Sequence, residues 1–462
     1  MHNVARIVQK YGGTSVATPE KITEVARQVR TTREAGHDVV VVVSAMGGTT
    51  DELLALASAV SERPDLRELD ALLCTGEARS AALLSLALNQ QGVASRSFGG
   101  PEAGIRTDQR HGGASIEKIE PGPLRSALEG GVVPVVAGFQ GEAGVGGART
   151  TLGRGGSDTT GVALAAALAA DHCEIVTDVS GVYTADPRHV TGARRHTALS
   201  YEEMAELATS GAKVLAPSSV EYARTHGVDL KVRSCQSVAD PGTWVGNHRP
   251  CDVRGTDDSW IAAPNGRPIA GVASQHGLVR CVLRRISADS ARRALAALAE
   301  HGIGMELCRY GNLGTEGVSD VAFTLSAADS EEARSLLTGA ALRGTLDELH
   351  WTSNLARLSV VGIGLGREAD SVLTMLQALR SVDARGTDLV VAPNALRVLI
   401  GESSLADVTQ SVHDAFVDGL AVPRIYPVPN RELSSQLGGE HRGPAIGEHR
   451  RSSNVPALTA VR

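Results

Sequence analysis

Aromatic side chains are scarce in this chain of 462 residues, because phenylalanine, tyrosine and tryptophan together make up only 3%. Few side chains are therefore available to stack on nucleic-acid bases. The 45 lysine and arginine residues are outnumbered by 52 acidic residues, which gives a formal net charge of -7. A protein that grips nucleic acid through its phosphates needs a basic surface. We therefore expect no nucleic-acid partner.

Cysteines and long apolar runs are also limited. The six cysteines are scattered without a CxxC pair, which favours a reducing compartment over a disulfide framework. No apolar run reaches the roughly 18 residues that a membrane-spanning helix needs, and the first residues lead directly into a strand-like segment. We expect a soluble, cytoplasmic protein that does not bind a membrane, with about three domains.

Glycine, by contrast, is abundant, with 51 residues, and many glycines stand in turns. The segment Leu-Gly-Arg-Gly-Gly-Ser-Asp-Thr-Thr at 152–160 precedes a helix-like apolar run at 162–168. A glycine-rich turn at the start of a helix presents N–H groups and the positive end of the helix dipole to an anion. A second glycine turn, Gly12 and Gly13, follows Lys10 and a strand-like segment at 5–9. An ordinary loop before a well-capped helix is the alternative for 152–160.

The five valines at 39–43 are typical of a strand that is covered on both faces, as in a parallel sheet. Further strands are expected at 132–137 and 173–177. One helix is expected to begin at about Pro19, with Thr18 as N-cap, a second to run from the turn after the valines to Leu56, and a third over 70–88. The alternation predicts a right-handed βαβ sheet whose functional loops share one edge. Polar residues that suit nucleotide phosphates with Mg²⁺ gather at that edge: Lys10, Ser44, Thr50, Arg154, Ser157, Asp158, Thr177, Asp178 and Lys213.

Glu77 lies among apolar residues of the helix expected at 70–88. The residue pattern alone leaves two interpretations open. It favours a charge on the helix surface over a buried carboxylate that faces a ligand.

Nine short motifs, in order along the chain, resemble the aspartate kinase family. They are KYGGTS at 10–15, SAMG at 44–47, TGE at 75–77, GFQG at 138–141, LGRGGSDTT at 152–160, TDVSGVYTADPR at 177–188, SGAKVL at 210–215, VEYAR at 220–224 and VRS at 232–234. The resemblance implies a three-layer αβα amino-acid-kinase fold with a mainly parallel sheet. It also implies ATP-dependent phosphorylation of L-aspartate to 4-phospho-L-aspartate with Mg²⁺, the first step of aspartate-family amino acid or related biosynthesis. A kinase of another small carboxylate or carbamate, and a non-catalytic amino-acid-binding regulatory protein, are the alternatives.

The resemblance also implies roles for individual residues, but it assigns no protein ligand to a metal. Aspartate presents a carboxylate that is already ionised at neutral pH, so the reaction needs positioning and cations rather than a strong base. Gly48, Ala216 and Ser218 depart from the family pattern and bear on the shape of the pocket. The implied catalytic residues are Lys10 and Asp158, the substrate-binding residues are Ser44, Thr50, Glu77, Arg154 and Ser157, and the ATP-binding residues are Lys10, Gly12, Gly13, Thr177, Asp178, Tyr183, Arg188 and Lys213.

The chain changes character after the kinase-like region, 1–246. We expect a connector at 247–268, two ACT-like βαββαβ modules at 269–346 and 353–428, the second closed by a strand at 421–426, and a disordered tail at 430–462. The resemblance implies a homodimer or a larger homo-oligomer formed through these modules. The stretches 284–291 and 362–370 lack the Asp-x-Pro-Gly type of turn with which the family binds lysine or threonine. Weak or absent feedback inhibition is therefore predicted, which would suit a dedicated secondary pathway.

Overall fold

The five valines form most of β2 (Asp38–Val43), and all five are completely buried. The odd-numbered valines pack in a core with α1 (Pro19–Glu34) and α3 (Leu66–Gln90). The even-numbered valines pack in a second core with α5 (Gly156–Leu168). Because successive side chains of a strand point to opposite faces, β2 is covered on both sides, as the valine run predicts.

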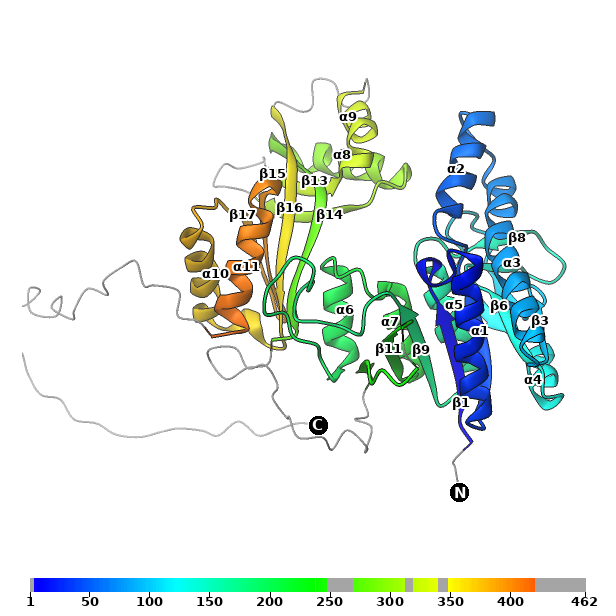
Figure 1. Ribbon diagram of the computed structural model, residues 1–462. Helices are drawn as coiled ribbons and strands as arrows, with labels where there is room; N and C mark the ends of the chain where they lie inside the picture. The colour runs from blue at the N-terminus through cyan, green and yellow to red at the C-terminus, as the bar shows by residue number, and fades with distance from the viewer. Residues whose placement is uncertain (1–3, 237, 247–268, 312–318, 340–347, 420–462) are drawn as a thin grey trace, which may run out of the picture. The chain divides into compact units, whose positions relative to one another are not determined.

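The main sheet contains eight strands in the order β10-β12-β11-β9-β1-β2-β6-β3 (Figure 1). Every neighbouring pair from β11 to β3 is parallel, and the one antiparallel pair is β11 with β12. With helices on both faces, this is the predicted three-layer αβα arrangement. The strands are β1 (Arg6–Tyr11), β2, β3 (Ser95–Phe98), β6 (Val133–Ala137), β9 (His172–Thr177), β10 (Ala198–Leu199), β11 (Leu230–Ser234) and β12 (Thr243–Val245).

The helices of this region begin where local chemistry favours it. Thr18 accepts a hydrogen bond from the N–H of Lys21, and Pro19 occupies the first turn of α1, as expected. Ser200 and Glu203 form a capping box at the start of α6, which satisfies two otherwise unpaired N–H groups. The other helical elements are the 3₁₀ turn η1 (Gly13–Val16), α2 (Thr49–Val60), α4 (Gly122–Glu129), α6 (Tyr201–Thr209) and α7 (Pro217–His226).

A small four-stranded sheet, in the order β5-β4-β7-β8, was not predicted from the sequence. Its strands are only three or four residues long, so they carry too little alternation to be recognised. The sheet is important because β8 ends directly before the glycine-rich segment 152–160. Its strands are β4 (Ile105–Thr107), β5 (Ile116–Ile119), β7 (Gln140–Ala143) and β8 (Arg149–Thr151).

The interior of the main sheet contains a buried polar network around Arg233, the middle residue of the VRS motif. Arg233 is completely buried, and its Nε donates to Oε2 of Glu174 at 3.0 Å. The same carboxylate oxygen accepts a hydrogen bond from Nε2 of Gln9 at 2.8 Å. These contacts join β11, β9 and β1, so they fix the strand at whose end Lys10 stands.

The remaining part of the chain forms a six-stranded antiparallel sheet in the order β14-β15-β13-β16-β18-β17. The two long central strands, β13 (Gly271–Ile286) and β16 (Glu348–Val361), contribute to both ACT-like modules. Residues 348–352, which lie between the predicted module boundaries, are therefore part of β16. The other elements are α8 (Ala288–Glu300), β14 (Met305–Gly311), β15 (Ser319–Ser326), η2 (Ala327–Asp329), α9 (Ser330–Thr338), η3 (Leu365–Arg367), α10 (Ala369–Ser381), β17 (Thr387–Ala392), β18 (Ala395–Gly401), η4 (Glu402–Ser404) and α11 (Leu405–Phe416).

The computed structural model describes residues 4–236, 238–246, 269–311, 319–339 and 348–419. The predicted connector at 247–268, the strand at 421–426 and the tail at 430–462 lie outside these residues. Among the described helices, only α3 is long and apolar enough to cross a membrane by length and composition. Half of its most apolar window is buried inside the fold, as in the core helix of a globular domain.

Candidate active site

Lys10 stands near the carboxyl end of β1, and its side chain meets the first turn of α5. The Nζ atom lies 2.5 Å from Oδ1 of Asp158, and the two side chains are only 11% and 13% exposed. Gly161 permits this approach, because a β-carbon there would lie 3.1 Å from Cβ of Lys10. A short, largely buried ion pair holds both groups in one position. The fold thus brings together the two residues predicted to be catalytic.

The turns that follow β1 and β2 lie against each other beside Lys10. The N–H of Gly47 donates to the carbonyl of Gly13, and the N–H of Ser44 donates to the carbonyl of Tyr11, both at 3.1 Å. A β-carbon at Gly13 would lie 2.8 Å from the carbonyl oxygen of Ala45, so a larger residue does not fit. A β-carbon at Gly12 would lie 3.8 Å from Nζ of Lys10. Glycine at this position therefore leaves one side of the ammonium group uncovered.

Glu77 is buried in α3 and faces the turn after β2. Only 4% of the residue is exposed, and Oε1 accepts a hydrogen bond from the N–H of Ala45 at 3.1 Å. Its other oxygen, Oε2, is buried without a hydrogen-bond partner among the described residues. Burial raises the pKa of Glu77 to about 7. The expectation of a surface charge is wrong, because Gly76 lets α3 pack directly against Ala45.

The first turn of α2 lies beside the same glycine turn. The hydroxyl of Thr49 donates to the carbonyl of Met46 at 2.6 Å and accepts from Nη2 of Arg79 at 2.5 Å. Thr50 follows it and is partly exposed, as is Ser44 at the end of β2. Two of the predicted substrate-binding hydroxyls thus lie at the edge where Glu77 is buried.

The segment 152–160 begins α5 after a left-handed residue, Gly155, whose φ is 77°. Ser157 is buried, and a β-carbon at Gly138 would lie 2.9 Å from its Oγ. Arg154 is exposed and makes no hydrogen bond or ion pair within the described part of the chain. The guanidinium is therefore available to an anionic ligand.

Two of the residues that depart from the family pattern, Ala216 and Ser218, lie against this segment. A β-carbon at Gly155 would lie 2.2 Å from Cβ of Ala216, and Oγ of Ser218 lies 3.0 Å from Oγ1 of Thr159. Gly48 is the exposed N-cap of α2. Ala216 and Ser218 therefore help to shape the loop that carries Arg154.

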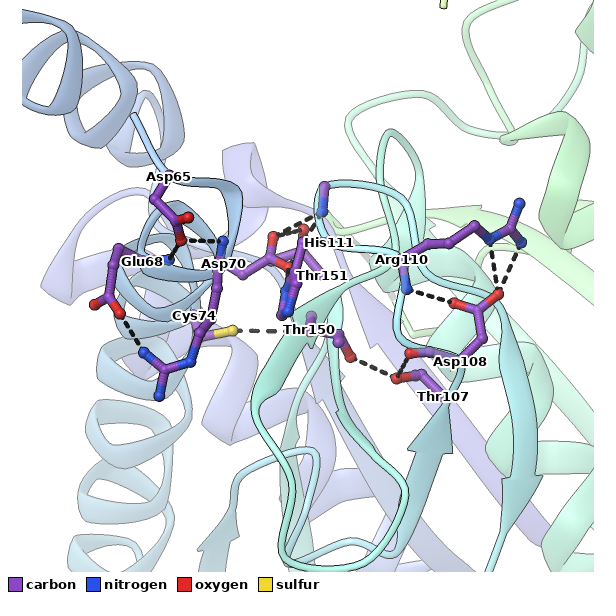
Figure 2. Close-up of polar contacts among 12 residues, drawn as sticks. Asp65, Glu68, Asp70, Cys74, Thr107, Asp108, Arg110, His111, Thr150 and Thr151 are labelled. Atoms are coloured by element: carbon purple, nitrogen blue, oxygen red, sulfur yellow. Dashed lines mark hydrogen bonds and ion pairs between the residues drawn. The ribbon is translucent and has the colours of Figure 1, made fainter. Parts of the chain in front are cut away.

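Asp70 and His111 support the same loop and were not recognised from the sequence (Figure 2). Asp70 is completely buried, and its carboxylate lies 2.7 Å from Nδ1 of His111. It also accepts hydrogen bonds from the hydroxyl of Thr151 at 2.5 Å and from the N–H of Gly112 at 3.1 Å. Because Thr151 directly precedes the segment 152–160, this network connects α3 to the loop. The signal that the sequence offered for this network was an aspartate in a largely apolar helix.

The residues predicted to bind ATP fall into two groups. Thr177 and Asp178 stand at the carboxyl end of β9, which neighbours β1, and the hydroxyl of Thr177 donates to Oδ1 of Asp178 at 3.0 Å. Tyr183 forms an isolated β-bridge with Arg195. Arg188 is exposed and paired with Asp186 at 2.7 Å, and Lys213 is exposed between α6 and α7. No described contact joins Tyr183, Arg188 or Lys213 to Lys10.

Comparisons with known proteins agree with these features. Residues 5–234 match the model of the amino acid kinase family. The aspartokinase of Corynebacterium glutamicum is 40% identical over 417 residues, which cover 89% of this chain and 96% of that protein. The aspartokinase of Thermus thermophilus is 40% identical over 420 residues, which cover 89% and 99% of the two chains. The chain belongs to the aspartokinase family.

Solved structures extend this relationship to the whole described fold. The crystal structure of E. coli aspartokinase III in complex with aspartate and ADP has 25% sequence identity and a TM-score of 0.72, and the match covers 88% of this chain and 99% of that one. Aspartate kinase from Clostridium acetobutylicum, at 21% identity and a TM-score of 0.66, supports the fold alone. This family member is an aspartate kinase in which an amino-acid-kinase region precedes ACT-like regulatory modules, which confirms the resemblance of the motifs.

Proposed function

We propose that the carboxyl edge of the main sheet transfers the γ-phosphate of ATP to the side-chain carboxylate of L-aspartate, which gives 4-phospho-L-aspartate and ADP. The observation that carries the proposal is that a basic and an acidic group share this edge: the Lys10 ammonium, held by Asp158, and the buried carboxyl group of Glu77 with one unpartnered oxygen. The first suits a phosphate group, and the second suits an α-ammonium group. Aspartate and ATP together supply both.

Lys10 reduces the main obstacle to this reaction, which is the repulsion between two anions. The side-chain carboxylate of aspartate is ionised near neutral pH and needs no base, since its ordinary pKa is about 3.9. Its oxygen attacks the γ-phosphorus while the bond to the β–γ bridging oxygen breaks, and ADP leaves with that electron pair. A fixed cation near the γ-phosphate stabilises the negative charge during transfer. Asp158 fixes the Lys10 ammonium for this role.

Aspartate is proposed to bind through charge at both ends of its α-carbon. Glu77 receives the α-ammonium at its unpartnered Oε2. Arg154, which is exposed and unpaired among the described residues, offers a two-pronged grip on the α-carboxylate. The hydroxyls of Ser44, Thr50 and Ser157 complete the proposed site.

ATP is proposed to bind between the Gly12–Gly13 turn and the end of β9. The cradle fits a phosphate, because glycine at 12 leaves one side of the Lys10 ammonium free of a side chain and a β-carbon at 13 would strike the carbonyl oxygen of Ala45. Thr177, Asp178, Tyr183, Arg188 and Lys213 are the proposed nucleotide contacts.

The described residues of this edge offer no group of three metal-binding side chains. This suits Mg²⁺, which prefers substrate phosphates plus one or two carboxylates. Bound there, Mg²⁺ would neutralise charge on the phosphates, and Asp178, an exposed carboxylate at the end of β9, is the residue that would hold it.

The cellular compartment and the oligomeric state of the enzyme are also proposed here. Four cysteines whose side chains the structure describes, Cys74, Cys173, Cys235 and Cys281, are free thiols, which suits a reducing cytoplasm. A homodimer or larger homo-oligomer formed through the ACT-like modules remains the proposed assembly.

Weak feedback control is also proposed, with a difference between the modules. Ser287 caps α8 by accepting from Ser290 N–H, and no glycine stands at this turn. The second module does have a glycine-dependent turn before α10: Gly364 is left-handed, and a β-carbon at Gly366 would lie 1.9 Å from the carbonyl oxygen of Ala392. The argument against effector binding at a helix start therefore applies to the first module only. Inhibition measured with lysine and threonine, singly and together, tests it, and strong inhibition by either would contradict weak control.

The function is tested by trapping the acyl phosphate with hydroxylamine in the presence of ATP, Mg²⁺ and a panel of amino acids. Aspartate should give the hydroxamate, and Lys10→Ala should lower its rate by at least about 10²–10³-fold, because a fixed charge in the transition state is lost. Lys118→Ala is the matched control, since Lys118 is 68% exposed and pairs only with Glu120. Circular dichroism should show that both variants are folded.

Two outcomes would contradict the proposal in different ways. Near-normal turnover of Lys10→Ala would remove Lys10 from the mechanism. Hydroxamate from another carboxylate but none from aspartate would keep the mechanism and change the substrate, and Ala216 and Ser218 would then be the first positions to examine.

A further inference from the structure

His413, in α11, is a completely buried histidine that the kinase mechanism does not use. Its Nε2 atom lies 2.9 Å from Oγ1 of Thr184, a residue of the segment between β9 and β10. Its other nitrogen, Nδ1, is buried and has no hydrogen-bond partner among the described residues. A buried ring nitrogen left unpaired is unfavourable, so it indicates a missing partner.

Two carboxylates face this nitrogen. Oδ2 of Asp418 lies 3.7 Å from Nδ1, and Oδ1 of Asp414 lies 3.9 Å from it. Both distances are too long for a hydrogen bond. They are close to the roughly 3.4 Å that separates two N or O ligands of one tetrahedral Zn²⁺ at bond lengths of about 2.0–2.2 Å. One ligand atom from each residue lies within 4.8 Å of the other two, so a small contraction would bring all three onto one ion.

Each of the three side chains also contacts a polar residue that is not itself a proposed ligand, and for His413 this residue is Thr184. Nη2 of Arg194 donates to Oδ1 of Asp418 at 2.6 Å, which leaves Oδ2 toward the histidine. Nε2 of Gln410 donates to Asp414 at 2.7 Å. Metal-binding histidines and carboxylates usually have such outer partners, which orient them. Asp418 and Asp414 remain 21% and 34% exposed, so an ion and its remaining water ligands have a route from solvent.

We propose that His413, Asp414 and Asp418 bind one divalent transition-metal ion, with Zn²⁺ as the preferred ion and water as the remaining ligand. An imidazole nitrogen with two carboxylates selects such ions over Mg²⁺ and Ca²⁺, which prefer oxygen alone. All three ligands lie in α11 or directly after it, and the contact between Thr184 and Nε2 of His413 would orient the imidazole toward the ion. None of these three ligands is among the residues proposed to bind ATP, Mg²⁺ or aspartate, so the inference does not depend on the proposed function.

The test uses the full chain after treatment with EDTA and desalting. Co²⁺ is titrated while its visible d–d bands are followed, and Zn²⁺ is then used to displace it. Wild type should bind one Co²⁺ with bands typical of nitrogen and oxygen ligands, and Zn²⁺ should displace it. Asp418→Asn and His413→Gln should each weaken binding at least about tenfold, and Thr184→Val about 10–100-fold through the outer contact. His276→Asn is the matched control, because His276 also lies near a carboxylate, 3.5 Å from Glu402, but is 55% exposed.

Several results would overturn the proposal. Equal Co²⁺ affinity in wild type and Asp418→Asn would exclude the carboxylate as a ligand, and thiolate-to-metal charge-transfer bands would assign the ion to cysteines. An equal loss in His276→Asn would indicate scattered surface binding. Asp414→Asn provides a second ligand variant, at a partly exposed position, in case His413→Gln does not fold.

Discussion

The interior of the main sheet and its carboxyl edge each bury a glutamate, and the two carboxyl groups are held in opposite ways. In the interior, Glu174 meets the guanidinium of Arg233 at 2.9 Å, and Lys231 lies 3.6 Å away. At the edge, Glu77 has one hydrogen bond, from the N–H of Ala45, and its Oε2 has none within the described residues.

The pKa values of the two carboxyl groups diverge for this reason. Burial by itself would raise both. At Glu174 the neighbouring His172, at 3.8 Å, and the positive charges of Arg233 and Lys231 overcome burial and lower the pKa below its ordinary value of 4.5. At Glu77 burial dominates and raises the pKa to about 7. A buried charge whose partners are present stabilises the fold, whereas one whose partner is missing is prepared for a ligand.

The largest effect on stability is expected from Glu174→Gln, which removes the negative charge in the interior of the sheet. The completely buried Arg233 would lose its counter-charge, and removing one partner of a buried pair costs about 3–5 kcal/mol in the free energy of unfolding. Urea denaturation followed by circular dichroism measures this loss. Glu77→Gln is the matched variant, since the same substitution at the edge should not destabilise the protein at pH 8. Equal losses of unfolding free energy at the two positions would mean that the ion pairs of Glu174 make no difference to stability.

The pH dependence of stability should differ in sign. Because the pKa of Glu174 is lowered by folding, its contribution is present above pH 4.5 and is lost as the pH falls through the lower folded value. The pKa of Glu77 is raised by folding, so its protonated form is favoured in the folded state. Its contribution is present below pH 4.5 and is lost as the pH rises from 4.5 through about 7. Glu77→Gln should remove this second loss, and unfolding midpoints at pH 5, 6.5 and 8 check it.

A smaller effect, on substrate affinity, is expected from Glu77→Gln. The amide keeps an acceptor for the N–H of Ala45 but loses the charge, and a hydrogen bond to a charged group is worth about 1.5–3 kcal/mol. The KM for aspartate should therefore rise by about one to two orders of magnitude, with the KM for ATP little changed. In wild type the KM for aspartate should also rise as the pH falls below about 7, because Glu77 becomes protonated. A wild-type KM that does not vary between pH 6 and pH 8 would contradict the proposed role.

The sequence predicts the strand and the helix on which the two glutamates lie, but neither the ion pairs of Glu174 nor the burial of Glu77. The valines of β2 and the glycines at 12, 13, 155 and 156 follow local rules, so β1, β2, β6, β9 and the glycine turns were predicted correctly. The residue pattern favours the helix surface for Glu77 over a buried position, because helical spacing gives no information on what packs against a helix. Its burial depends on Gly76, which allows α3 to approach Ala45, and on the distant turn after β2.

The contacts that join distant segments were the least predictable. Asp70 pairs with His111, 41 residues away, and with Thr151, 81 residues away. The strands that bring them together, β4, β5, β7 and β8, are too short to show a period. The Thr184–His413 contact spans 229 residues, and no local pattern connects its two ends. In the ACT-like region, each module was predicted as a separate unit, whereas β13 and β16 serve both, because one strand of up to 16 residues pairs along its whole length.

The smallest expected effect tests whether buried charge in this protein also positions a loop. Asp70→Asn keeps the size of the side chain but weakens its bonds to His111 and Thr151 (Figure 2). About 1–1.5 kcal/mol of hydrogen-bonding energy is at stake, so kcat/KM for aspartate should fall about tenfold as the loop that carries Arg154 loosens. Asp108→Asn is the control, because Asp108 bonds to Arg110 and Ser115 in the neighbouring loop but does not contact Thr151. If both variants lose the same activity, the network stabilises the small sheet in general. If only Asp70→Asn loses activity, and its KM for aspartate changes more than its KM for ATP, Asp70 positions the substrate loop. Its carboxylate would then share one property with each glutamate. Like Glu174 it has its hydrogen-bond partners within the protein, and like Glu77 it serves the substrate site.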